Sequence, residues 1–316
     1  MKSFAFVFPG QGSQAVGMLD GWGDHPAVKL ALEEASQALG EDLAKLIRSG
    51  SKESLALTTN TQPVMLAAGV AAFRAWRAEG GELPAAMAGH SLGEYSALVA
   101  ADTLTLADAA SLVRFRAQAM QDAVPVGTGA MAAILGMDAR KVIEGCADVM
   151  HSFGIDTAEV VEAVNFNDPA QPVIAGSKAA VEKACEVLKA SGAKRALPLP
   201  VSAPFHSSLM KPAAEQLKVK LAATAFRSPK VPVINNIEAK SESDPDRIRA
   251  ALYEQAFGPV RWVDCVLAIK ARGIGTIVEC GPGKVLAGLC KRIDPGLTGA
   301  ALYDPATLTD VKGLLA

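Results

Sequence analysis

Ser91 is the residue whose neighbours point most directly to chemistry, because it is the centre of Gly89-His90-Ser91-Leu92-Gly93. Gly-x-Ser-x-Gly is the pattern of a nucleophile elbow, a tight strand-to-helix turn that holds a serine hydroxyl away from the backbone. Glycine is needed on both sides because neighbouring Cβ atoms would crowd so sharp a turn. The apolar residues 84–88 predict the strand, and residues 94–101 predict the helix. An ordinary strand-to-helix turn also fits this pattern, so the assignment depends on finding a base for Ser91.

The chain has four histidines, and they can be compared one by one as that base. His25 precedes a proline in a polar segment, and His151 lies where a predicted helix ends. His90 adjoins Ser91, and neighbouring residues on a strand point to opposite faces. His206 lies in the segment 201–210, where the chain returns to the predicted core. His206 is therefore the candidate base, since a serine needs one to become a nucleophile; a structural histidine is the alternative.

Arg116 lies on a helix predicted over 106–121, with Thr105 as its N-cap. The apolar stripe of this helix consists of Leu106, Ala109, Ala110, Val113, Ala117 and Met120. Apolar neighbours flank Arg116 at three and four residues, so its side chain is expected to point inward, whereas Arg114 is expected to point toward solvent. A buried arginine is costly without a partner. Either a protein carboxylate or a bound anion should therefore meet Arg116.

The order of predicted elements indicates an α/β fold with an insertion. An apolar run at 3–8 is typical of a buried parallel strand, and the predicted helices include one that begins at Pro63 and ends before Gly80-Gly81. In the middle of the chain the order becomes strand, helix, strand, strand, helix, strand, over 131–135, 139–150, 161–166, 171–175, 177–191 and 194–200. We therefore predict a hydrolase-like core with a parallel sheet, formed by residues 1–128 and 201–316. A ferredoxin-like βαββαβ subdomain, residues 129–200, interrupts it.

The glycine-rich loop Pro9-Gly10-Gln11-Gly12-Ser13-Gln14 follows the first predicted strand. It lacks both the Lys-Ser/Thr pair of a P-loop and the Gly-x-Gly-x-x-Gly of a dinucleotide site, which argues against phosphate binding. A plain turn fits the loop. Alternatively, Gln11 offers its backbone N–H to an active site.

The composition restricts the class of protein. Among 316 residues, 31 Lys and Arg face 33 Asp and Glu, which gives a formal net charge of −2 and no case for binding nucleic acid or membrane surfaces. The N-terminal residues lack the layout of a signal peptide. The five cysteines show no Cys-x-x-Cys spacing, and no two histidines have the spacing of zinc ligands. We expect free thiols, a cytoplasmic location and no metal.

With these residues located, the chain resembles the malonyl-CoA:acyl carrier protein transacylases, the loading enzymes of fatty-acid synthesis. The resemblance covers residues 8–294. It rests on five segments in order, which are Pro9-Gly10-Gln11-Gly12-Ser13-Gln14, Gly89-His90-Ser91-Leu92-Gly93-Glu94-Tyr95, Val201-Ser202-Ala203-Pro204-Phe205-His206, Pro259-Val260-Arg261-Trp262 and Gly281-Pro282-Gly283-Lys284-Val285-Leu286. The fold of that family, a hydrolase-like core with a ferredoxin-like insert, agrees with the predicted organisation. Asp102 and Asp168 depart from the small residue and the serine that are usual at these positions.

The resemblance implies a role for each matching residue. Ser91 would attack the thioester carbonyl of malonyl-CoA, and His206 would take its proton and later activate a phosphopantetheine thiol. The backbone carbonyl of Gln255 would orient the histidine. The backbone N–H groups of Gln11 and Leu92 would form the oxyanion hole.

Substrate recognition is implied in the same way. Arg116 would bind the malonyl carboxylate through two hydrogen bonds, which would explain an inward arginine. Asn165 matches an active-site asparagine of the family. Phe205 resembles the residue of malonyl-selective members, where its bulk would crowd the methyl group of methylmalonyl.

The implied partners are malonyl-CoA or CoA and an acyl carrier protein, whose phosphopantetheine is carried by the partner. No cofactor would be bound to the chain, and a monomer is the default expectation. Cationic candidates for docking the acidic carrier protein are Lys189, Lys194, Lys284, Lys291 and Arg292; solvated helix faces would also explain them.

Other functions share some of these motifs. A free-standing acyltransferase of polyketide synthesis and the loading subunit of a malonate decarboxylase could share all of them. A serine esterase or thioesterase could use Ser91 and His206 without Arg116, and a non-catalytic carrier-protein-binding module would need neither.

Overall fold

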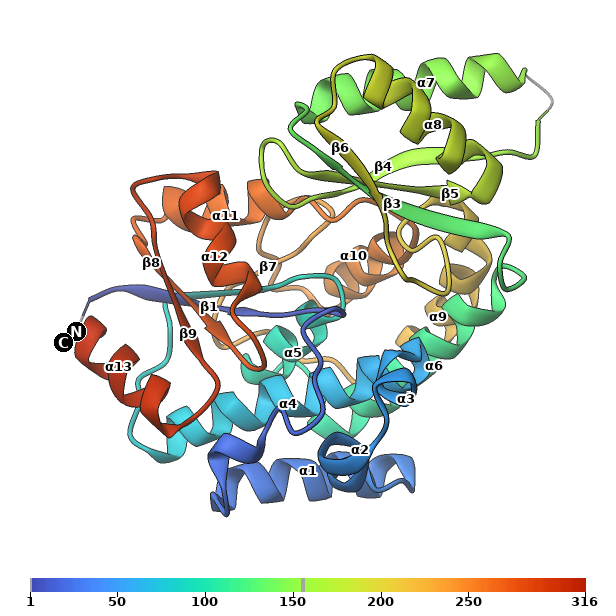
Figure 1. Cartoon of the computed structure of the whole chain (residues 1–316). Helices are drawn as coiled ribbons and strands as arrows, with labels where there is room; N and C mark the ends of the chain where they lie inside the picture. The colour runs from blue at the N-terminus through green and yellow to red at the C-terminus, as the bar shows by residue number, and fades with distance from the viewer. Residues whose placement is uncertain (1, 155–156) are drawn as a thin grey trace.

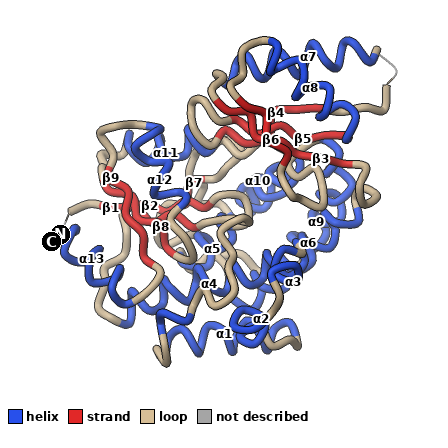
Figure 2. Tube along the Cα trace, in the orientation of Figure 1, coloured by secondary structure: helices blue, strands red, loops and turns tan. Residues whose placement is uncertain are grey.

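The computed structural model describes residues 2–154 and 157–316 and contains two β-sheets (Figures 1 and 2). Met1, at the start of the predicted core, and residues 155–156, within the predicted subdomain, lie outside the described residues. The larger sheet has five strands in the order β7-β2-β1-β8-β9, and the smaller one has four in the order β4-β5-β3-β6. None of the helices in the described residues combines the length and hydrophobicity that a bilayer span requires.

The larger sheet is parallel throughout, as predicted for the core. Its strands are β1 (Phe4–Phe8), β2 (Ala86–Gly89), β7 (Val233–Ile234), β8 (Thr276–Cys280) and β9 (Thr298–Leu302). Alternate residues of β1 face opposite sides, with the aromatic side chains of Phe4, Phe6 and Phe8 in one hydrophobic cluster and Ala5 and Val7 in the other. Helices cover both faces, so the sheet is buried between two cores.

The helices of this core bring distant segments to the carboxyl ends of the strands. They are α1 (Pro26–Leu39), α2 (Leu43–Ser49), α3 (Lys52–Ala56), α4 (Thr58–Ala78), α5 (Gly93–Ala100), α6 (Leu106–Asp122), α9 (Lys211–Ala222), α10 (Pro245–Phe257), α11 (Trp262–Ala271), α12 (Val285–Ile293) and α13 (Pro305–Leu315). Short 3₁₀ turns occupy Asp20–Trp22 and Ser208–Met210. The two ends of the chain lie side by side, since the Lys2 N–H donates to the Leu315 carbonyl at 2.8 Å (Figure 1).

The smaller sheet is antiparallel and has the strand order of a ferredoxin-like βαββαβ unit. Its elements are β3 (Gly129–Leu135), α7 (Ala139–Phe153), β4 (Val161–Phe166), β5 (Pro172–Ser177), α8 (Lys178–Ala190) and β6 (Arg195–Pro198). Both helices lie on the outer face of the sheet (Figure 1). On the inner face, Met131, Ala133 and Val164 join the main hydrophobic cluster of the larger unit. The two units therefore share one core.

A short backbone bridge also joins the smaller sheet to the loop between α10 and α11. The Phe166 N–H donates to the Val260 carbonyl at 2.9 Å, and the Val260 N–H donates to the Val164 carbonyl at 2.8 Å. The register of β4 shifts between Ala163 and Asn165, which is a β-bulge at this junction. Bulges bend a strand and redirect side chains, so the bulge decides where Asn165 points.

Two features of the core differ from the sequence prediction. Helix α4 begins at Thr58, not at Pro63, and contains the proline in its second turn. Proline removes one backbone donor there, and the burial of most residues of α4 compensates for the lost hydrogen bond. Strand β9 and helices α11 and α13 are not predicted from the sequence. Asp102 has a φ of 61°, a conformation that favours glycine.

Candidate active site

Ser91 lies on the turn between β2 and α5, with a φ of 52°. This left-handed conformation costs a non-glycine residue on the order of 1–2 kcal/mol, and both flanking glycines are needed for the turn. A Cβ on Gly89 would lie 1.9 Å from the Gly93 backbone, and a Cβ on Gly93 would lie 2.1 Å from the Phe8 carbonyl oxygen. The structure thus has the elbow that the pattern predicts.

The hydroxyl of Ser91 lies 2.7 Å from Nε2 of His206. On the other side of the ring, Nδ1 of His206 lies 2.9 Å from the backbone carbonyl of Gln255. A carbonyl only accepts hydrogen bonds, so Nδ1 carries the proton and the lone pair of Nε2 faces the serine. This tautomer is the one that can accept the proton of Ser91.

His206 is buried and has a φ of 67°, so both members of the pair have left-handed backbone conformations. Burial first, and then the positive charge of Arg116, together lower the pKa of His206 to about 3. The hydrogen bond to the Gln255 carbonyl opposes these effects. The imidazole of the free protein is therefore neutral at physiological pH.

Gln11 and Leu92 line the same cavity as Ser91 and His206. The loop of Gln11 passes close to the elbow, since a Cβ on Gly10 would lie 2.5 Å from the His90 carbonyl oxygen. In residues 2–154 and 157–316, neither the Gln11 N–H nor the Leu92 N–H has a hydrogen-bond acceptor. The Gln11 side chain accepts a hydrogen bond from the Thr58 hydroxyl at 2.9 Å, which holds the loop against α4.

Arg116 is 2% exposed and points inward from α6, as predicted. Its Nη1 donates to Gln62 Oε1 at 2.8 Å, and its Nη2 donates to Gln255 Oε1 at 3.0 Å and to Ser91 Oγ at 3.1 Å. Its Nε is buried and has no acceptor among the described residues. Since no carboxylate of the described chain lies within ion-pair distance of Arg116, the structural ion pair is the wrong alternative. Arg114 instead forms the surface ion pair, with Glu41.

These groups line one cavity of about 130 Å³. The remaining predicted residues also belong to it, since Asn165 reaches it from the bulge of β4 and Phe205 from the loop that carries His206. The Asn165 Oδ1 is buried and has no donor among the described residues. Apolar walls come from Met120, Met131, Leu199 and Val201, so both structural units contribute to the cavity.

Comparisons with known proteins agree with this geometry. The family described as "Acyl transferase domain" matches residues 5–293. The chain belongs to the acyltransferase family. The malonyl CoA-acyl carrier protein transacylase of Escherichia coli K12 is 52% identical over 98% of this chain and 98% of its own length. These matches confirm the family that the sequence resembles.

Solved structures give the same result. An acyl-carrier-protein S-malonyltransferase from Burkholderia pseudomallei has a TM-score of 0.94 and 59% identity, covering 98% of this acyltransferase and 99% of that chain. A malonyl-transacylase in complex with a type II PKS acyl-carrier protein has a TM-score of 0.94 and 48% identity, covering 98% of each chain. The predicted hydrolase-like core with an added subdomain is therefore the fold of this family.

The structure of this acyltransferase also shows residues that the sequence reading missed. Asn236 supports the elbow, because its Oδ1 accepts from the Ser91 N–H and its Nδ2 donates to the Gly89 carbonyl, both at 2.7 Å. Gln62 shares Arg116 with Gln255. These contacts join residues 54 to 147 positions apart. Spacing within a short stretch of sequence therefore cannot predict these contacts.

His90, which was set aside as a base, has another partner. Its Nε2 lies 2.7 Å from Asn167 Oδ1, in the turn between β4 and β5, and its ring packs near Trp262. Burial lowers the pKa of His90. The residue before the nucleophile therefore connects the elbow to the smaller sheet.

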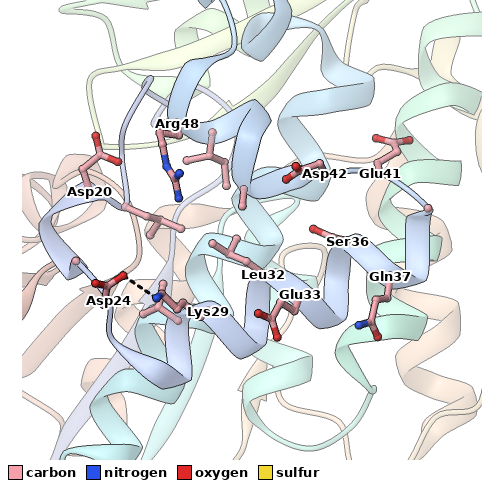
Figure 3. A pocket seen from close by; sticks show the side chains of 16 residues that line it. Asp20, Asp24, Lys29, Leu32, Glu33, Ser36, Gln37, Glu41, Asp42 and Arg48 are labelled. Atoms are coloured by element: carbon pink, nitrogen blue, oxygen red, sulfur yellow. Dashed lines mark ion pairs between the residues drawn. The ribbon is translucent and has the colours of Figure 1, made fainter.

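A second, larger hollow of about 970 Å³ lies between α1, α2 and the turn before them (Figure 3). Its labelled side chains mix acidic groups such as Asp20, Glu33 and Asp42 with Lys29, which pairs with Asp24 at 2.6 Å. It shares no lining residue with the cavity at Ser91. The catalytic geometry lies in the smaller cavity.

The candidate docking cations divide into two groups. Arg292 lies 3.3 Å from Asp168 and donates to Gln171, so it joins α12 to the smaller unit. Among the described residues, the four lysines, Lys189, Lys194, Lys284 and Lys291, have no acidic partner within 4.0 Å, and all are exposed.

Proposed function

We propose that this acyltransferase moves a malonyl group from malonyl-CoA to the phosphopantetheine thiol of an acyl carrier protein, through an ester on Ser91. The single observation that carries the proposal is the position of Arg116. A buried guanidinium 3.1 Å from the Ser91 hydroxyl, with an unused Nε–H and no carboxylate partner in the described chain, suits an acyl group that ends in a carboxylate. The names of the relatives support the same substrate.

In the first half-reaction Ser91 Oγ attacks the thioester carbonyl while its proton passes to Nε2 of His206. The tetrahedral intermediate collapses, the C–S bond breaks, and the proton on Nε2 goes to the departing CoA thiolate. The Gln11 and Leu92 N–H groups would hold the oxyanion, and one such donor can contribute ~3 kcal/mol to the transition state. Malonyl-Ser91 and CoA are the products of this half.

Arg116 has a second effect on His206 in this scheme. Its charge lowers the pKa of the imidazole in the free protein. A malonyl carboxylate bound to the guanidinium would cancel much of that charge, so the pKa of His206 should rise when the substrate is in place. The substrate carboxylate would thus make His206 a stronger base only when the correct acyl group is bound.

In the second half-reaction the thiol of the carrier protein gives its proton to Nε2 of His206 and attacks the ester carbonyl. The C–O bond to Ser91 breaks, and the proton returns to Ser91 Oγ. Throughout both halves the carbonyl of Gln255 would hold the Nδ1–H of His206. Asn165 would contact the substrate with its free Oδ1, and Phe205 would limit branching next to the carbonyl.

The carrier protein is the proposed acceptor, supported by the relative seen in complex with a type II PKS acyl-carrier protein. The exposed lysines at 189, 194, 284 and 291 are the candidates for its docking. We further propose a cytoplasmic monomer without a bound cofactor, with residues 129–200 as the inserted subdomain; the five unpaired cysteines support the reducing compartment. Fatty-acid synthesis is the proposed pathway, with polyketide synthesis and malonate decarboxylation as alternatives.

Intact-protein mass spectrometry after incubation with malonyl-CoA tests the proposal. The unsubstituted protein should gain one malonyl adduct, Ser91→Ala should gain none, and Ser96→Ala, at another serine of α5, should be labelled normally. Holo carrier protein should then remove the adduct far faster than buffer does. An unlabelled unsubstituted protein would favour a non-catalytic binding module, and equal release of malonate with and without carrier protein would favour a thioesterase.

A further inference from the structure

Glu94 is a buried carboxylate that the mechanism above does not use. It lies in the first turn of α5, three residues after Ser91, and is 2% exposed. Its Oε2 accepts hydrogen bonds from the Asn236 N–H and from Gln255 Nε2, both at 2.9 Å. Among the described residues no cation lies within ion-pair distance of it. A buried charge without a counter-charge is costly, so its retention beside a nucleophile needs a reason.

The nearest opposite charge that Glu94 reaches is Arg116, and the side-chain amide of Gln255 lies between the two groups. Gln255 donates to Glu94 through Nε2 and accepts from Arg116 through Oε1. Nε2 also donates to the Ser91 carbonyl at 3.0 Å. The ionised Glu94 carboxylate and the Ser91 carbonyl can only accept, so they force the amide nitrogen toward themselves and the amide oxygen toward the arginine. The two charges favour each other's ionised forms across this amide.

We infer that Glu94 is a positioning residue, a counter-charge that stabilises Arg116 through the Gln255 amide without occupying its guanidinium. A carboxylate in direct contact with Arg116 would fill the donors that the substrate needs. With no acidic partner at all, the buried guanidinium would be uncompensated in the empty site. Placing one amide between the charges satisfies both requirements. The inference rests on the proposed function, because it presumes that Arg116 receives an acyl carboxylate.

The arrangement has a measurable consequence for binding. With Glu94 ionised, the buried groups around the acyl site have no net charge, and the attraction for a carboxylate is reduced. Glu94→Gln keeps an oxygen for Asn236 and Gln255 and removes the charge, so an anionic acyl group should bind more tightly. Coulomb's law at an effective dielectric constant near 20 gives a gain on the order of tenfold across a gap the length of one amide and its hydrogen bonds. If Glu94 only stabilised the turn at Ser91, replacing it would not tighten the binding of an anionic acyl group.

The experiment is a calorimetric titration with malonyl-CoA and acetyl-CoA, which differ only in the acyl carboxylate. Ser91→Ala provides a background without turnover, and Glu94→Gln is added to it. At pH 8.5 the expected result is about tenfold tighter binding of malonyl-CoA and unchanged binding of acetyl-CoA. Weaker malonyl-CoA binding, or an equal change for both thioesters, would overturn the inference. A third protein, Ser91→Ala with Arg116→Ala, tests the proposed function separately, since it should lose the preference for malonyl-CoA whatever Glu94 does.

A measurement that leaves Glu94 unchanged covers the case in which the Glu94 variant does not fold. It uses Ser91→Ala combined with His206→Asn, because a His206 whose pKa rises when a malonyl carboxylate binds would change the same affinity ratio. Burial raises the pKa of Glu94 to about 7, so Glu94 is neutral at pH 6 and charged at pH 8.5. The ratio of malonyl-CoA to acetyl-CoA affinity should fall about tenfold over that interval, and a flat ratio would contradict the inference. The other titratable or charged groups that face Glu94 are Arg116, Tyr95, Cys265 and Glu242. Burial raises the pKa of Tyr95 to about 12 and that of Cys265 further, so neither ionises in this interval.

Discussion

Replacing Arg116 by alanine should lower the rate of malonyl loading much more than the rate of acetyl loading. The guanidinium holds Gln62 and Gln255 with two donors and leaves Nε free. A hydrogen bond to a charged group contributes about 1.5–3 kcal/mol, so losing two to a malonyl carboxylate removes about 3–6 kcal/mol of transition-state binding. That is a loss of about 10²–10⁴-fold in kcat/KM for malonyl loading. Acetyl loading uses none of these carboxylate contacts and should fall far less.

The assay is rapid-quench formation of the acyl-enzyme, followed by mass spectrometry, with malonyl-CoA and acetyl-CoA measured in parallel. The ratio of the two rates is the quantity of interest, because the substitution also leaves amide oxygens of Gln62 and Gln255 unpaired and both rates share that damage. Arg114→Ala is the matched control, since it lies on the same helix and pairs with Glu41 away from the cavity. Arg116→Lys should fall between, as a point charge without the planar donors. An equal loss for both acyl groups would refute the carboxylate-binding role.

Three further substitutions test the elbow, the base and the acyl pocket. Gly89→Ala should abolish acylation and lower Tm, because the new Cβ meets the Gly93 backbone at 1.9 Å; Gly288→Ala, whose Cβ meets nothing within 4 Å, should leave both intact, and equal effects would contradict the steric reasoning. His206 is protonated near pH 6.5 in the unfolded chain and only near pH 3 in the folded protein. Proton binding therefore favours the unfolded state, and the free energy of unfolding falls as the pH falls below 6.5. Between pH 6.5 and 5 the unsubstituted protein should therefore lose ~2 kcal/mol more unfolding free energy than His206→Asn in urea titrations, and parallel curves would contradict this. Phe205→Ala should raise methylmalonyl relative to malonyl loading, measured by competition, whereas an unchanged ratio would exclude Phe205 from selectivity.

The parts of the site that could be predicted are those encoded by local pattern. Ser91 follows from the spacing of two glycines, and the inward direction of Arg116 follows from helical periodicity. His206 could be chosen because only four histidines exist. In each case the physical requirement acts within a few residues of the chain, so the sequence displays it directly.

The rest depends on contacts between distant segments. The sequence predicts that Arg116 meets either a protein carboxylate or a bound anion, but it does not predict the amide oxygens of Gln62 and Gln255 that accept its hydrogen bonds in the described residues. The residues next to Asn236 in the sequence do not predict that its side chain accepts a hydrogen bond from the Ser91 N–H, 145 residues away. The predicted start of α4 is wrong because Pro63 is typical of a first turn, whereas in the structure the burial of most residues of the helix tolerates it in the second turn.

The shared core has a consequence for how substrates come and go. Met131, Ala133, Val164, Val173 and Ala175 of the smaller sheet are packed into the main hydrophobic cluster. Lifting that sheet as a lid would expose them to water, at about 25 cal/mol for each Å² of apolar surface. Access to Ser91 is therefore expected to depend on side-chain rotamer changes, which take picoseconds to nanoseconds, and not on a domain rotation of microseconds to milliseconds. The backbone around the access path and the Ser91–His206 pair would then keep one arrangement, while the substrate enters and leaves.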